Sequence, residues 1–119
     1  MTFSLSAFAF IAVLLGMAFL FGAPVHACEK MIASHYGRES GSKTADGSFF
    51  DGSQMVAAHR TWKFGTRIRV SYNGKSVDLT VRDRGPYIRG RSLDISTAAA
   101  KKIGMVGVGV AEVCVTTLK

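Results

Sequence analysis

The clearest pattern along the chain is an alternation of apolar and polar residues across positions 67–83, interrupted at Asn73-Gly74. Alternation is typical of a strand with one buried face, and Asn-Gly is the preferred pair for a two-residue type I′ turn. The pattern therefore predicts a β-hairpin. By the same period Asp83 falls on the face of Val81, so we expect its carboxylate to point toward the core side at the end of the strand.

Weaker patterns predict the other regular elements. Ser96 can cap a short helix over 97–103, and Gly104 is the expected stop. Further extended segments are expected at 32–36, 55–59, 92–95 and 106–117. Several short strands and one helix in a single small domain predict a mainly β fold, a small barrel.

A long loop is expected between the first two of these strands. Residues 38–53 are rich in Gly, Ser, Thr and Asp, but the aromatic pair Phe49-Phe50 interrupts them. Long loops in compact domains are commonly functional when they are ordered. We therefore expect this loop to be held against the core by its two aromatic residues.

The first 27 residues differ from the rest of the chain. They contain no Lys, Arg, Asp or Glu, and positions 7–23 are almost wholly apolar. Together with Ala27 before Cys28, this pattern predicts a signal peptide over 1–27, cleaved after Ala27. An uncleaved membrane anchor is the alternative. Either way, residues 28–119 are expected to form one exported domain, in the periplasm or cell envelope.

The net charge indicates what kind of partner the protein binds, and the two cysteines indicate a disulfide. The formal net charge of +7 lies entirely in residues 28–119, which indicates an anionic partner such as a wall polymer, and export argues against nucleic acid. The two cysteines, Cys28 and Cys114, are expected to form a disulfide in an oxidising compartment. A lipid anchor at Cys28 is the alternative, although Val25 and His26 fit a lipoprotein signal poorly.

The candidate chemistry is that of carboxylates. His35 and His59 stand apart from any Cys-x-x-Cys or His-x-x-x-His pattern, so we expect neither a metal nor another cofactor. Asp83 and Asp94 come from separate segments and could supply acid and base for cleavage of a glycosidic bond, with His59 from a third segment. Structural roles remain open at this point: Asp83 could cap a turn, and Asp94 could favour the N-terminus of the helix.

Short sequence blocks sharpen this hypothesis. They are Ala33–Gly37, Thr44–Gly47, Ala57–Thr61, Phe64–Val70, Val81–Tyr87, Gly90–Ser96 and Ala98–Met105. Together they resemble the RlpA-like family over nearly the whole of residues 28–119. The resemblance implies a six-stranded double-psi β-barrel with one or two short helices. It also implies a lytic transglycosylase that cleaves peptide-stripped peptidoglycan strands and leaves 1,6-anhydromuramyl ends. We expect the protein to be a monomer.

The resemblance also implies site residues. Asp83 and His59 match catalytic positions of the family, and Asp94 matches an aspartate needed in related expansin-like barrels. We expect Asp83 to be the acid and base, and His59 and Asp94 to orient it or to stabilise charge. The residues expected to line the sugar groove are Tyr36, Ser48, Arg84 and Tyr87.

One catalytic position of the family does not carry over. Ser48 stands where the family has a glutamate, and a serine cannot act as a carboxylic acid. Loss of a general acid or base commonly lowers a rate by about 10² to 10⁴. The alternative is therefore a non-catalytic or expansin-like module that binds peptidoglycan.

Overall fold

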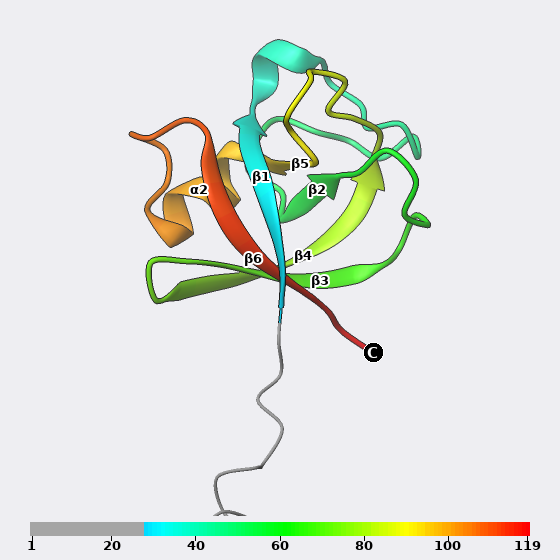
Figure 1. Ribbon diagram of the computed structural model, residues 1–119. Coiled ribbons are helices and arrows are strands. Elements are labelled where there is room, and N and C mark those ends of the chain that lie inside the picture. Colours follow the sequence, from blue (N-terminus) through cyan, green and yellow to red (C-terminus); the bar gives the residue numbers. More distant parts are fainter. Residues whose placement is uncertain (1–27) are drawn as a thin grey trace, which may run out of the picture.

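The computed structural model describes residues 28–119, so the predicted signal peptide over 1–27 lies outside the described residues (Figure 1). Six strands close into a barrel in the order β1-β5-β2-β4-β3-β6. Their bounds are β1 Glu29–Tyr36, β2 Val56–Ala58, β3 Arg67–Tyr72, β4 Lys75–Asp83, β5 Leu93–Ser96 and β6 Ala111–Thr117. Within residues 28–119, the helix α2 (Thr97–Ile103) and the 3-10 turn η1 (Arg38–Ser40) accompany these strands. The predicted mainly β barrel is confirmed.

The hairpin is formed by β3 and β4, as predicted. The two strands are antiparallel, with Ile68 opposite Leu79 and Val70 opposite Val77. Its turn has positive φ at both central positions, 53° at Asn73 and 82° at Gly74. These are the angles that a type I′ turn requires, and Asn and Gly tolerate them best.

The first and last strands differ from the predicted ranges. β1 begins at Glu29 rather than residue 32, because its first half pairs with β6. β6 begins only at Ala111, because residues 106–110 form turns instead of continuing the strand. Two pairings are parallel, β1 with β5 and β2 with β4.

Helix α2 has the predicted bounds. The Ser96 hydroxyl accepts a hydrogen bond of 3.2 Å from the backbone N–H of Ala99, and Gly104 ends the helix with φ of 76°. Its buried residues, Ala99, Ala100 and Ile103, join the cluster that fills the barrel. The helix thereby closes one side of the core.

A second apolar cluster lies outside the barrel core. It consists of Tyr36, Phe50, Val56 and Ala58. The rings of Tyr36 and Phe50 stack with centroids 4.8 Å apart, so Phe50 holds the long loop down as expected. Phe49 does not share this role, since 65% of it is exposed. Figure 1 shows η1 and loop 84–92 at the same end of the barrel, where β1, β2 and β4 end.

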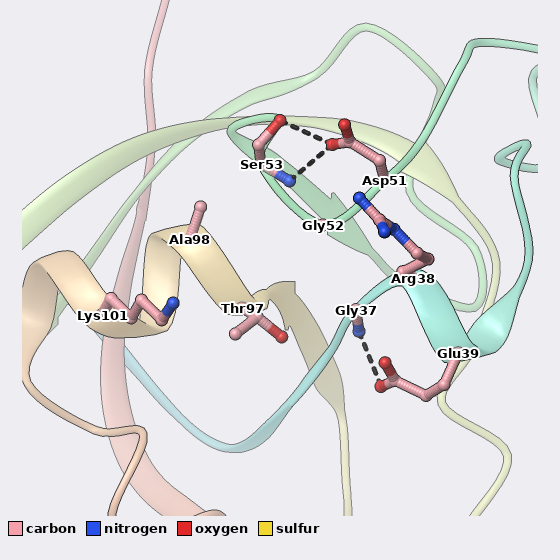
Figure 2. Close-up of a pocket in the computed structure, with 9 residues that line it drawn as sticks. All are labelled: Gly37, Arg38, Glu39, Asp51, Gly52, Ser53, Thr97, Ala98 and Lys101. Atoms are coloured by element: carbon pink, nitrogen blue, oxygen red, sulfur yellow. Dashed lines mark hydrogen bonds between the residues drawn. The ribbon is translucent and has the colours of Figure 1, made fainter.

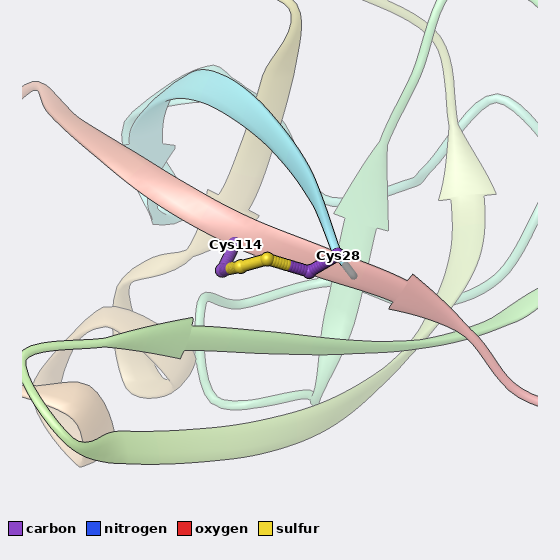
Figure 3. The surroundings of a disulfide bond; sticks show 2 residues. All are labelled: Cys28 and Cys114. Atoms are coloured by element: carbon purple, nitrogen blue, oxygen red, sulfur yellow. A yellow bond between two sulfur atoms is a disulfide. The ribbon is translucent and has the colours of Figure 1, made fainter. Parts of the chain in front are cut away.

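A disulfide joins Cys28, the residue before β1, to Cys114 on the neighbouring strand β6 (Figure 3). The bridge links residues 86 positions apart, with their Cα atoms separated by 5.3 Å. Disulfides of this kind are typical of proteins that work outside the cytoplasm. In the part of the chain that the structure describes, no helix is long and apolar enough to span a membrane.

Candidate functional site

Asp83 and Asp94 are brought together by strand register. Asp94 on β5 pairs with Ser34 on β1 and with Ala58 on β2, and Ala58 pairs in turn with Asp83 on β4. We call Ser34, Asp94, Ala58 and Asp83 the carboxylate row. Residues in register on neighbouring strands present their side chains to one face, and two strand spacings place the aspartate Cα atoms about 10 Å apart. Ala58 belongs to the outer cluster, so the row lies on the outer face of the barrel.

A β-bulge puts Asp83 in this row. The register between β2 and β4 shifts between Ala57 and Ala58, so that Ala57 pairs with Val81 but Ala58 pairs with Asp83. The extra residue, Arg82, breaks the alternation that placed Asp83 on the face of Val81. The expectation that Asp83 points toward the core side is therefore wrong. Asp83 faces the outer cluster, on the opposite side of the sheet from Val81.

Three donors hold the Asp83 carboxylate. The Tyr36 hydroxyl donates to Oδ2 at 3.0 Å, and the backbone N–H groups of Ala45 and Arg84 donate to Oδ1 at 2.9 Å each. These donors come from β1, the long loop and the residue after β4. Asp83 is therefore fixed as an acceptor, and it ties the loop to the barrel.

Asp94 is partly buried and accepts a hydrogen bond from one side chain. The Ser34 hydroxyl donates to its Oδ1 at 3.1 Å. Burial raises the pKa of Asp94 to about 6, and the charge of Asp83 acts in the same direction, while Ser34 and the charges of His35 and Arg91 oppose the shift. The two carboxyls thus differ in environment, and Asp94 can carry a proton in mildly acidic solution.

Both carboxyls open into one cavity of about 240 Å³. Its lining consists of Tyr36, Ser40, Lys43, Ala58, Asp83, Arg84 and Asp94. Four of the residues singled out from the sequence therefore meet here. Ser40, Lys43 and Ala58, together with Ser34 behind Asp94, were not singled out, because polar or small residues in a loop or short strand carry no pattern of their own.

His59 lies beside this cavity rather than in its lining. Its Nδ1 accepts hydrogen bonds of 3.1 Å from the backbone N–H groups of Thr61 and Trp62, and its ring stacks on that of Trp62 at 3.9 Å. Burial and the charge of Arg60 lower the pKa of His59, which keeps Nδ1 free to accept. The side chain therefore caps a turn directly after β2, and its catalytic role stays a prediction.

Arg84 and Tyr87 take different positions after β4. The Arg84 guanidinium donates to the carbonyl oxygens of His59 and Trp62, at 3.2 and 2.7 Å, and lies 3.8 Å from the centre of the Phe64 ring. Arg84 therefore lines the cavity, and its hydrogen bonds to these two carbonyls stabilise the turn after β2. Tyr87 is 76% exposed in loop 84–92 and makes none of the hydrogen bonds of the carboxylate row.

Ser48 lies in a tight turn of the long loop, outside the cavity lining. Its carbonyl accepts from the Thr44 N–H at 2.9 Å, and its own N–H donates to Asp46 Oδ1 at 3.0 Å. Burial opposes the charge of Asp46, but hydrogen bonds from Ser48, Thr44 and Arg82 outweigh it and hold the pKa of Asp46 well below its usual range. Asp46 is therefore committed to the turn, and it does not line the cavity of Asp83 and Asp94.

A larger cavity of about 470 Å³ lies between the long loop and α2 (Figure 2). The acids that border it are tied to the backbone: Glu39 accepts from the Gly37 N–H at 2.8 Å, and Asp51 accepts from the Ser53 N–H at 3.0 Å. None of the residues predicted from the sequence borders this cavity. Across residues 28–119, no group of three or more His, Cys, Asp or Glu side chains is placed to hold a metal ion.

Comparisons with known proteins identify the family of the chain. The family model described as lytic transglycolase matches residues 29–115. Proteins from Nostoc sp. and Aquifex aeolicus, each named "Probable endolytic peptidoglycan transglycosylase RlpA", are 50% identical over 92 residues. The alignments cover 73% and 72% of this chain but only 25% and 41% of those relatives. The chain therefore spans less than half the length of these curated relatives.

Solved structures share the barrel at low sequence identity. Streptomyces papain inhibitor has a TM-score of 0.63 at 23% identity, covering 81% of this chain and 100% of that chain. An expansin from Clavibacter michiganensis has a TM-score of 0.61 at 18% identity, covering 76% of this chain and 50% of that chain. The chain thus belongs to the RlpA-like lytic transglycolase family, and residues 29–115 are its double-psi β-barrel domain.

Proposed function

We propose that this protein is an exported lytic transglycosylase that cleaves peptide-stripped glycan strands of peptidoglycan, as a monomer, in the periplasm or cell envelope. The observation that carries the proposal is the carboxylate row, in which two carboxyls open into one cavity but differ in environment. Pairs of this kind divide the work of acid and base between them. The names of the relatives, endolytic peptidoglycan transglycosylases, support the choice of substrate.

In the proposed reaction, Asp94 in its protonated form gives its proton to the glycosidic oxygen as the bond from C1 to that oxygen breaks. The Asp83 carboxylate faces the positive charge that develops at C1. It then accepts the proton of the C6 hydroxyl of the same sugar as that oxygen closes on C1, which forms the 1,6-anhydro ring. His59 and Arg84 act as positioning residues through the turn that they hold after β2.

A second candidate is a wall-binding module without catalysis. Ser48 favours it, because the position of the family's glutamate carries no acid and the nearby Asp46 is committed to its turn. An expansin mutant with the same fold was solved in complex with cellohexaose, which supports binding of a glycan by this kind of barrel.

The test incubates the purified protein with peptide-stripped glycan strands and measures anhydromuramyl products by mass spectrometry. We expect product from the wild type and a loss of about 10² or more in rate for Asp83→Asn and Asp94→Asn. Asp78→Asn is the matched control, since Asp78 pairs with Arg69 on the outside of the hairpin. Strand binding by the wild type without any product would establish the second candidate instead.

A further inference from the structure

Lys43, which lines the cavity, and its partner Phe49 in the long loop have no part in the reaction described above. Lys43 and Phe49 form an isolated antiparallel bridge within the long loop. Residues paired in this way present their side chains to one face. Lys43 lines the cavity of the carboxylate row, so Phe49 stands on the same side of the loop. Phe50 turns the opposite way into the outer cluster and is 1% exposed, whereas Phe49 is 65% exposed.

The turn between these residues is fixed to β4 close to the carboxylate row. The Ala45 N–H donates to Asp83, and the Asp46 N–H donates to the Arg82 carbonyl at 3.1 Å. An ion pair of 3.2 Å between Arg82 and Asp46 adds a third link. The position of Lys43 and Phe49 relative to Asp83 is therefore set by the fold.

Lys43 is the cation of the cavity lining that remains available to a ligand. The lining contains two cations, and the other, Arg84, already donates to two backbone carbonyls. The ion pairs found within residues 28–119 are Arg69–Asp78 and Arg82–Asp46, so Lys43 has no carboxylate partner there. An anionic sugar approaching the Asp83 carboxylate would be repelled, and a cation at position 43 offsets that repulsion.

We propose that Lys43 and Phe49 together recognise a muramic acid residue of the glycan strand. The exposed face of Phe49 packs against the C–H face of the sugar ring, toward which the ring quadrupole is attractive. Lys43 pairs with the carboxylate of the lactyl ether, which is free only where the stem peptide has been removed. This inference rests on the proposed function and explains at the level of residues why stripped strands are selected.

The test is a binding measurement by calorimetry in the full protein carrying Asp94→Asn, which stops turnover. The probes are peptide-stripped strands, the same strands with their carboxyls converted to amides, and chitin oligosaccharides of equal length. We expect stripped strands to bind about tenfold more tightly than the other two, as one charge-assisted contact allows. Lys43→Gln should remove this difference, and Phe49→Ala should weaken all three probes about three- to tenfold.

Matched controls are Lys75→Gln at the tip of the hairpin and Val108→Ala, an exposed apolar residue in another loop. Both should leave binding unchanged. Equal affinity of the protein for stripped and amidated strands would overturn the role of Lys43, and unchanged binding by Phe49→Ala would overturn the role of Phe49. Both of those results leave the proposed function intact, whereas a protein that binds none of the probes contradicts the proposed function as well.

Discussion

The hydroxyl of Tyr36 donates a hydrogen bond of 3.0 Å to Oδ2 of Asp83, across 47 residues of sequence. Burial raises the pKa of Tyr36 far above its usual value, and the charge of Asp83 adds to the effect. The phenol therefore keeps its proton at any pH that the protein meets and remains a donor. The orientation of Asp83 thus depends on a side chain from β1, which stands three strands away from β4 in the order of the barrel.

Tyr36→Phe should lower the rate of strand cleavage about tenfold, because Asp83 loses the donor that fixes Oδ2. Stability should fall by about 1–2 kcal/mol, since the ring and its packing remain. Product formation and thermal unfolding measure the two effects. Tyr72→Phe, on the hairpin, is the control and should change neither. A rate for Tyr36→Phe equal to that of the wild type would show that Asp83 needs no such support.

The raised pKa of Asp94 predicts a pH dependence of stability. Its pKa rises from 3.8 in the unfolded chain to about 6 in the folded one. The folded state therefore holds the proton more strongly, and the resulting stability is fully present below pH 3.8 and is lost as pH rises through about 6. Asp94→Asn should remove this slope when denaturant unfolding is followed between these values. The rate of cleavage should also fall above about pH 6, and a rate that rises there would exclude Asp94 as the acid.

Substitution at position 48 tests whether the absence of the family's glutamate limits the rate of cleavage. Ser48→Glu restores the family's glutamate and should raise the rate of cleavage by up to about 10², the usual contribution of one acid or base. Ser42→Glu, which adds the same charge at an exposed place in the same loop, is the control. The measurement is again anhydromuramyl release from stripped strands. A rate within twofold of the wild type would show that the two aspartates work without a third carboxyl.

His59 can be tested as a structural cap. His59→Ala removes the acceptor of two backbone N–H groups and should destabilise the fold by about 1–3 kcal/mol. His59→Asn keeps an acceptor near the place of Nδ1 and should recover most of that loss, as asparagine does at other turns. Denaturant unfolding measures stability, and product release measures activity. A stable His59→Asn protein without activity would show that the imidazole has a direct part in the reaction.

Reduction of the Cys28–Cys114 bridge should lower stability by about 4 kcal/mol, the value expected for a closed loop of this length. Denaturant midpoints with and without a reducing agent measure the difference. The double variant Cys28→Ser, Cys114→Ser should have the same denaturant midpoint as the reduced wild type. Its midpoint should not change when the reducing agent is added. Two free thiols on the unreduced, unfolded protein would contradict the bridge.

Local chemistry explains what could be predicted from the sequence. Ser96 and Gly104 each act on the backbone next to them, so both ends of α2 were predictable. Asn73 and Gly74 fix the hairpin in the same way, because their positive φ values define the turn. The sequence blocks that resemble the family predicted the double-psi barrel and identified Asp83 and Asp94 as candidate site residues.

Long-range pairing explains what could not be predicted. The bulge at Arg82 depends on the pairing with β2, where the register shifts between Ala57 and Ala58. Alternation along β4 alone therefore predicts the wrong face for Asp83. The role of Ser34 could not be predicted, because only the parallel pairing of β1 with β5 places it beside Asp94. Lys43 was overlooked for a similar reason, since only its bridge to Phe49 shows which way it faces.

The carboxylate row takes one residue from each of β1, β5, β2 and β4, and these residues are spread over positions 34 to 94. Strand β2 lies between β5 and β4, so without it Asp94 and Asp83 are not joined in one row. The groove is therefore a property of the completed barrel alone. Asp83 and Asp94 therefore share one cavity only when all four of these strands are paired.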